Sequence, residues 1–111
     1  MDQELEHLFS HLRKCAFGPD AIPPEMFRVA PGPLARLIGP AFRHFYSIAR
    51  EPLQFKGGVI VDLLKASGFC TECSGSRGIL ISNVLGKAYR KCVRNRLVPF
   101  AEEYALDSQY Q

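Results

Sequence analysis

The sequence predicts an α+β fold in which helices pack around a short antiparallel β-hairpin. Apolar residues recur every three to four positions near both ends of the chain, which is the spacing of amphipathic helices. Between them lie two short β-branched segments bounded by glycine, residues 59–64 and 78–82, the pattern of paired strands. At 111 residues, 47% hydrophobic and 23% charged, the chain is one domain or part of one, and it is too apolar to be disordered.

The first segment, residues 2–15, is predicted to be a helix with Asp2 as its N-cap. Its apolar stripe consists of Leu5, Leu8, Phe9 and Leu12. His7 and His11 stand four residues apart, a spacing that would let them bind a metal together. Because no acidic partner follows at the right spacing, we interpret them as surface histidines.

Two helices are predicted between the first helix and the hairpin. Pro23 and Pro24 suit the first turn of a short helix, and the sequence Pro31-Gly32-Pro33 is expected to end it. A longer helix then runs from about Pro33 to Arg50, and Gly39-Pro40 is expected to kink or break it. Its predicted apolar stripe consists of Leu34, Leu37, Ile38, Phe42, Phe45 and Ile48.

Pro52 marks the exit into a loop, and the connector between the two strands, residues 66–76, reads as a flexible loop. A last helix is predicted over residues 83–98, with Pro99 limiting its end. Its apolar face would carry Leu85, Ala88, Tyr89, Cys92, Val93 and Leu97, and its other face Lys87, Arg90, Lys91 and Arg94.

The net charge of +3 conceals a basic segment. Residues 65–96 hold seven basic residues and one acidic residue, a charge of +6, so the rest of the chain carries −3. A local excess of one sign favours an anionic partner, although a solvated basic helix face would show the same pattern. No apolar run approaches the roughly 20 residues that cross a bilayer, and the acidic N-terminus lacks signal-peptide features. We therefore expect no membrane association and an intracellular protein of the cytoplasm or nucleus.

The four cysteines, Cys15, Cys70, Cys73 and Cys92, are expected to be reduced thiols in such a compartment. Cys70 and Cys73 have the spacing of half a zinc knuckle, but no second pair follows them, and structural zinc needs four ligands. We expect Cys73 to be a small buried residue at the base of the hairpin.

Three blocks of the sequence resemble the fingers region of non-LTR (LINE-type) retrotransposon reverse transcriptases. They are residues 18–25, which begin Gly-Pro-Asp-Ala-Ile-Pro, residues 52–65, and residues 73–82 with the helix that follows. Residues 106–109 are similar to the segment just before the palm of these enzymes. The family usually has glycine where Ala21 stands, and Asn-Tyr where Gly75-Ser76 stand. The resemblance implies a partial reverse transcriptase domain over residues 1–111: a helical segment (1–50), a fingers hairpin (55–82), a basic helix (83–98) and a lead into the palm (99–111).

By this resemblance, Arg77 would contact the phosphates of the incoming deoxynucleoside triphosphate, and Lys65 would supply a second cation. Lys87, Arg90, Lys91 and Arg94 would meet the backbone of the RNA template or DNA primer. The alternatives are structural: Arg77 pairing with Glu72 or Asp62, and Lys65 ending a strand in water.

The family is an RNA-directed DNA polymerase, a nucleotidyltransferase that holds Mg²⁺ with palm aspartates. Those aspartates come downstream of a segment like residues 106–111, and neither Asp62 nor Asp107 matches their pattern. We therefore assign no catalytic residue and no Mg²⁺ ligand within these 111 residues, and expect that this chain alone does not polymerise. The segment 106–111 reads as cut rather than finished.

Three other interpretations stay open. The first is a non-enzymatic nucleic-acid-binding module that uses the same basic helix. The second is a small metal or redox protein built on Cys70 and Cys73, and the third is an inactive retrotransposon relic.

Overall fold

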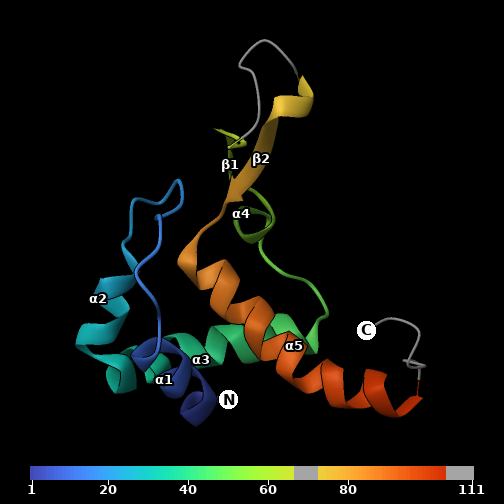
Figure 1. Cartoon of the computed structure of the whole chain (residues 1–111). Helices are drawn as coiled ribbons and strands as arrows, with labels where there is room; N and C mark the ends of the chain where they lie inside the picture. The colour runs from blue at the N-terminus through green and yellow to red at the C-terminus, as the bar shows by residue number, and fades with distance from the viewer. Residues whose placement is uncertain (67–72, 105–111) are drawn as a thin grey trace.

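The computed structural model describes residues 1–66 and 73–104, and within them it shows helices and one two-stranded antiparallel sheet. The predicted α+β class is confirmed. The elements in chain order are α1 (Asp2–Ser10), α2 (Pro24–Val29), α3 (Pro31–Ser47), α4 (Leu53–Lys56), β1 (Val59–Leu64), the 3-10 turn η1 (Cys73–Gly75), β2 (Ser76–Ile81) and α5 (Val84–Tyr104) (Figure 1).

Helix α1 ends five residues before its predicted end. The Ser10 hydroxyl donates to the carbonyl of His7 at 2.9 Å, and Nδ1 of His11 lies 2.9 Å from the same oxygen. Side-chain donors of this kind compete with the helical ladder, and here they close α1 at Ser10. Its N-cap position is Met1, without a side-chain cap, so the prediction of Asp2 as N-cap was wrong.

Helix α2 begins at Pro24 as predicted, but residues 31–33 open α3 rather than only ending α2. Helix α3 continues through Pro40 to Ser47, so the predicted break at Gly39-Pro40 does not occur. Its buried stripe contains Ala35, Gly39 and Phe42, with Leu34, Ile38 and Phe45 half-buried. Leu37 is 75% exposed and Ile48 48% exposed, so the predicted stripe was too wide.

The core lies where α1, α3, α4 and α5 meet, and aromatic rings fill its centre. Phe55, from the short α4 that replaces a predicted loop, is buried among Phe42, Phe45 and Tyr89 at centroid distances of 6.1–6.2 Å. The edge-to-face arrangement of the Phe55 ring with Phe42 and Phe45 is a favoured geometry for aromatic pairs. Phe9 of α1 extends the cluster towards Phe27 of α2 at 5.3 Å.

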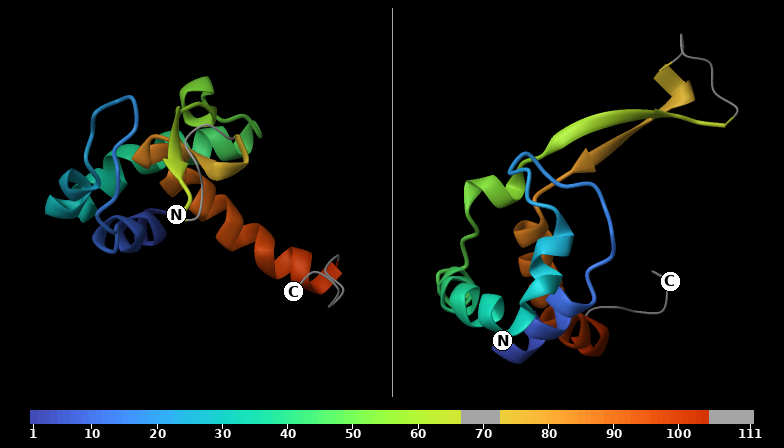
Figure 2. Two further views of the ribbon diagram at one scale, coloured as in Figure 1. Left: turned by 45° about the horizontal axis from the view of Figure 1, so that its top comes forward. Right: turned by 90° about the vertical axis from the view of Figure 1, so that its left-hand side faces the viewer.

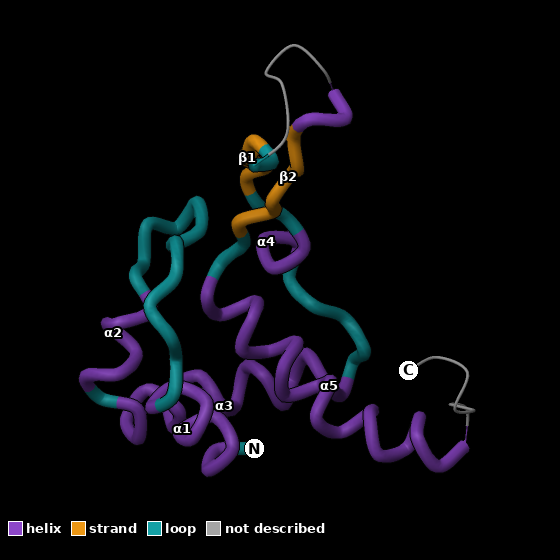
Figure 3. Tube along the Cα trace, viewed as in Figure 1, coloured by secondary structure: helices purple, strands orange, loops and turns teal. Residues whose placement is uncertain are grey.

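The β-hairpin stands outside this core. Strands β1 and β2 pair from Val59 opposite Ile81 to Leu64 opposite Ser76, but every residue of β1 is exposed. Figure 2 shows the hairpin arching away from the helices, and Figure 3 shows it joined to them at the root by α4 and by the start of α5. The prediction that the helices pack around the hairpin was therefore wrong: they pack against one another and carry the hairpin.

Helix α5 passes its predicted limit at Pro99 and runs to Tyr104. Its buried residues, Val84, Ala88, Tyr89 and Cys92, lie in its first half, whereas Leu97 and Phe100 are 55% and 67% exposed. Proline removes one ladder bond, yet the helix continues on both sides of it. Among the described residues, no helix combines the length and the apolar character that spanning a membrane requires.

Ala49 ends α3 in the left-handed region, with φ of 51°. The amide of Arg50 donates to the carbonyl of Phe45 at 3.2 Å, and the amide of Ala49 donates to the carbonyl of Tyr46 at 3.2 Å. Glycine is favoured at a helix end of this kind.

We predict that Ala49→Gly raises the free energy of unfolding by about 1 kcal/mol, because a Cβ is strained at this φ. Urea denaturation followed by circular dichroism measures it.

The matched control is Ala41→Gly, at an exposed position within the same helix. There glycine is expected to lower stability by about 1 kcal/mol, since it relieves no strain. A loss of stability in both variants would contradict the assigned conformation of Ala49.

Candidate nucleic-acid interface

Lys65 and Arg77 come together near the outer end of the hairpin. Arg77 is paired with Leu63, and the amide of Lys65 donates to the carbonyl of Gly75 at 2.8 Å, which extends the pairing beyond β1. Because side chains alternate along a strand, Lys65 and Arg77 share one face of the sheet. The Lys65 ammonium donates to the carbonyl of Ser74 at 2.6 Å, which draws it over the η1 turn.

Asp62 does not share that face. It is paired with Gly78, so its side chain belongs to the face opposite Arg77. The ion pairs between described residues are Arg43–Asp2, Arg90–Glu51 and Arg96–Glu4, and none of them involves Arg77 or Lys65. The proposed partner Glu72 and the loop residue Cys70 lie outside the described residues. The register thus favours an outward guanidinium at Arg77 over a pairing with Asp62.

The four cations predicted on the last helix occupy the outward side of α5. Ala88, Tyr89 and Cys92 face the core, while Arg90, Lys91 and Arg94 are exposed and Lys87 is half-buried. Their spacing of three to four residues places them along one side of the helix. This part of the predicted site is brought together by the helix itself.

Arg90 differs from the other three because its guanidinium is engaged within the protein. It donates to the carbonyl of Phe55 and lies 3.4 Å from a carboxylate oxygen of Glu51. These contacts tie the segment before the hairpin to α5. A phosphate would have to compete with both partners for Arg90, so Lys87, Lys91 and Arg94 are the cations better placed to meet one.

Two separate grooves flank the basic side of α5. A groove of about 770 Å³ between the end of α3 and α5 contains Arg90 and Arg94 beside the rings of Tyr46 and Tyr89. Burial, followed by the nearby carboxylate of Glu51, raises the pKa of the Tyr89 hydroxyl, so this hydroxyl stays neutral at pH 7. The guanidinium carbon of Arg96 lies 5.3 Å from the centre of the Tyr46 ring, a cation–π contact.

The second groove, of about 210 Å³, lies between α1 and α5 and contains Lys87 and Lys91. Here the structure adds residues that the sequence prediction had left on a plain surface: His7, His11 and Arg13. The i, i+4 spacing of the histidines placed them on one side of α1. That this side meets the lysines of α5 depends on how the two helices pack, which no local pattern encodes.

The three blocks of the resemblance meet at the root of the hairpin. Gly18 is packed against Asn83, and a cavity of about 380 Å³ is lined by Pro19, Asp20, Gln54, Gly57, Gly58 and Asn83. The Asp20 carboxylate accepts a bond from the amide of Ile22 at 3.4 Å, which closes the turn. Within this turn Ala21 has a φ of 56°, a conformation that favours glycine.

The predictions for two of the cysteines have opposite outcomes. Cys73 is exposed, so its predicted burial at the base of the hairpin was wrong, whereas Cys92, predicted on the apolar face of the last helix, is buried. The base of the hairpin is its helical end, whereas Cys73 lies in η1 beyond the outer ends of the strands. Among the described residues, no three His, Cys, Asp or Glu side chains gather in a group that would hold a metal ion.

No protein-family model matches this chain, and neither a curated protein nor a solved structure matches it.

We predict that Gly18→Ala lowers the free energy of unfolding by about 1–3 kcal/mol, the usual cost of overpacking. A Cβ at Gly18 would lie 2.7 Å from the backbone nitrogen and 2.8 Å from Cα of Asn83, so the turn or the start of α5 has to shift. The matched control is Gly57→Ala, where a Cβ meets nothing within 4 Å and φ is −92°. Equal urea midpoints for the two variants would contradict the contact between Gly18 and Asn83.

We also predict that Cys92 resists thiol reagents in the folded protein. Burial, assisted by the Glu4 carboxylate, raises the pKa of its thiol to about 11, so little of the reactive thiolate forms near pH 8. In a Cys70→Ala background, a colorimetric thiol assay is expected to show fast reaction of Cys15 and Cys73 and a slow phase that Cys92→Ala abolishes. A fast phase from all three would contradict the burial of Cys92.

The same raised pKa fixes the sign of a pH effect. The pKa of the thiol in the unfolded chain is about 8.5, so the unfolded state loses its proton first as the pH rises. The contribution of this thiol to stability is complete below that pH and declines towards pH 11. Urea midpoints measured at pH 7.5 and 9.5 should fall more steeply in the parent than in Cys92→Ala.

Proposed function

We propose that this chain forms the fingers portion of a reverse transcriptase domain of the non-LTR retrotransposon type. In this proposal Arg77 and Lys65 bind the phosphates of an incoming deoxynucleoside triphosphate. Lys87, Lys91 and Arg94 bind the backbone of the RNA template or DNA primer, with Arg90 chiefly holding the Phe55 segment in place. The described residues do not fit a Mg²⁺ site, so no step through a metal is assigned to them.

The observation that carries the proposal is the meeting of the three sequence blocks at the root of the hairpin. Three parts of the chain that are far apart in sequence line one cavity there: Pro19 and Asp20, then Gln54, Gly57 and Gly58, then Asn83. The left-handed Ala21 adds support, because the family usually has glycine there and the turn adopts the backbone conformation that glycine favours. Ala21 differs from the family's usual glycine but keeps the backbone conformation that glycine favours. This agreement supports common descent.

The chemistry of the two cationic sites suits the roles given to them. A planar guanidinium on an exposed strand face binds a phosphate through two parallel bonds, and a nearby ammonium adds charge. Phosphoryl transfer depends mainly on positioning the triphosphate and neutralising its charge. The exposed cations along one side of α5 suit a contact with the phosphate backbone that is independent of sequence.

A second candidate, a nucleic-acid-binding module without nucleotide binding, is favoured by one observation. Arg77 lies six residues before Asn83 along an extended strand, roughly 20 Å at 3.3 Å per residue. The outward side of α5 therefore lies well away from the Arg77 guanidinium and is able to bind a polyanion without it. The two candidates differ in whether a triphosphate binds at the hairpin.

The experiment measures two affinities of the full 111-residue chain: for a fluorescent deoxynucleoside triphosphate with Mg²⁺, and for a 20-nucleotide RNA. We expect Arg77→Ala to weaken triphosphate binding by about tenfold or more, since a bond to a charged group contributes about 1.5–3 kcal/mol, and to leave RNA binding unchanged. Lys91→Gln with Arg94→Gln should weaken RNA binding and lower the salt slope by about 1 per lost phosphate contact.

The matched control is Arg36→Gln, which removes an exposed cation from α3. RNA binding without a triphosphate affinity that depends on Arg77 would reject the fingers proposal in favour of the simple binding module. If neither ligand binds in a manner sensitive to these residues, both candidates fail.

A further inference from the structure

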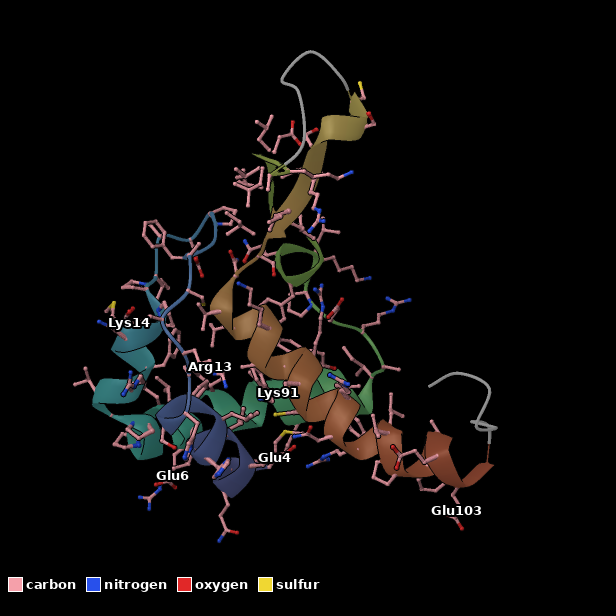
Figure 4. The ribbon with its side chains drawn as sticks, in the orientation of Figure 1. Glu4, Glu6, Arg13, Lys14, Lys91 and Glu103 are labelled. Carbon is pink, nitrogen blue, oxygen red and sulfur yellow. The ribbon has the colours of Figure 1, made fainter. Side chains whose placement is uncertain are left out.

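The hollow between α1 and α5, called here the α1–α5 groove, has the composition of an anion site. Its floor is apolar, formed by Leu8, Leu12 and Ala88. Its remaining lining residues all carry basic nitrogen: His7, His11, Arg13, Lys87 and Lys91. In Figure 4, Arg13 in the segment after α1 and Lys91 on α5 lie on the two sides of this groove. Its volume, about 210 Å³, is several times the roughly 30 Å³ that one water occupies, which is enough for a tetrahedral oxyanion.

No carboxylate lines the groove to balance these cations. The acids of α1 contact residues outside the groove. Asp2 bonds Arg43 of α3 at 2.5 Å, Glu4 lies 3.5 Å from Arg96 further along α5, and Glu6 is directed at Gly32, where a Cβ would meet its carboxylate at 3.3 Å. The ionisable groups that line the groove are thus His7 of α1, His11 at its C-cap, Arg13 beyond them, and Lys87 and Lys91 of α5.

The hydrogen bonds of His11 fix which nitrogen carries its proton. The Ser10 hydroxyl donates its proton to the carbonyl of His7, so towards His11 it acts as an acceptor. Nδ1 of His11 lies 2.9 Å from both the Ser10 oxygen and the His7 carbonyl oxygen. Facing two acceptors, Nδ1 must be the protonated nitrogen, which leaves Nε2 as an acceptor in the neutral ring.

The oxygens of sulfate and of a nucleic-acid phosphodiester only accept hydrogen bonds, so they bind Nε2 of His11 only when the ring is the imidazolium. The ring of His7 is stacked on that of His11 with the ring centres 4.3 Å apart, so the two rings lie side by side at the groove. Histidine is the side chain whose charge ordinarily changes between pH 5 and 8. An anion contact through Nε2 of His11 is therefore coupled to uptake of a proton by that ring.

We propose that the α1–α5 groove is a phosphate-binding site that fills when its histidines take up a proton. The natural source of the phosphate is the backbone of the nucleic-acid strand that crosses α5, because Lys87 and Lys91 belong both to the groove and to the outward side of the helix. This assignment of the source rests on the proposed function. The phosphate site itself does not.

The first measurement titrates the full chain with inorganic sulfate, a tetrahedral dianion whose charge is constant from pH 5.5 to 7.5. We expect sulfate to bind about tenfold more tightly at pH 5.5 than at pH 7.5, which corresponds to uptake of about half a proton averaged over these two pH units. The amide resonances of Lys87, Ala88 and Lys91 should shift as it binds. Equal affinity at the two pH values, or shifts elsewhere in the wild-type chain, would overturn the proposal without any variant.

The second measurement uses variants. His7→Gln with His11→Gln should abolish the pH dependence and leave the weaker affinity supplied by Arg13 and the lysines. Lys91→Gln should weaken sulfate binding at both pH values. The matched control is His44→Gln, an exposed histidine of α3 away from the groove, which should change neither. A pH dependence that survives the double histidine variant would overturn the proposal.

The third measurement repeats the pH comparison with a 20-nucleotide RNA, whose phosphodiesters do not titrate in this range. RNA binding that tightens at pH 5.5 and loses this response in the double histidine variant supports a backbone phosphate in the groove. If sulfate affinity depends on pH and RNA affinity does not, the groove does not bind a nucleic-acid phosphate. That result would overturn the proposed source of the phosphate and leave the proposed function standing. Sulfate binding without RNA binding would reject the proposed function and support a free phosphate as the ligand.

Discussion

The packing of Phe55 against α5 is the contact on which the arrangement of this protein depends. Its ring is buried among Phe42, Phe45 and Tyr89, and its carbonyl accepts a bond from Arg90. Its backbone lies so close to Gly86 that a Cβ there would be 3.2 Å from Cα of Phe55. One residue thus joins the aromatic core, the basic helix and the segment that enters the hairpin, and the absence of a side chain at Gly86 allows the approach.

The hairpin is not stable by itself and depends on its attachment to the helices. An isolated two-stranded hairpin is marginal in water, and here apolar side chains on both of its faces are exposed, such as Ile60 at 70% and Leu63 at 51%. Its position is fixed at the root, where β1 follows the Phe55 segment and β2 leads into the buried Ser82 and Val84. The cations of the hairpin and those of α5 therefore belong to two parts of the molecule with different local stability.

The elements that the sequence predicted well are those specified by local patterns. The β-branched runs between glycines gave both strands within two residues, and the spacing of the α5 cations gave their common side. Features set by packing were missed. The exposure of Leu37 and Ile48 depends on how much of α3 its neighbours cover. The early end of α1 depends on two side chains bonding one carbonyl, and the basic groove depends on which side of α1 meets α5. Helix α4 has only four residues, Leu53–Lys56, which is too short for a helical period to show in the sequence.

Because the hairpin is long and attached only at its root, a small rotation at the root displaces its outer end by a large distance. Arg77 lies roughly 20 Å from the root, so a rotation of about 10° there displaces its guanidinium by roughly 3.5 Å, more than the length of a hydrogen bond. The geometry of any ligand held at the outer end is consequently decided by side chains that never touch it.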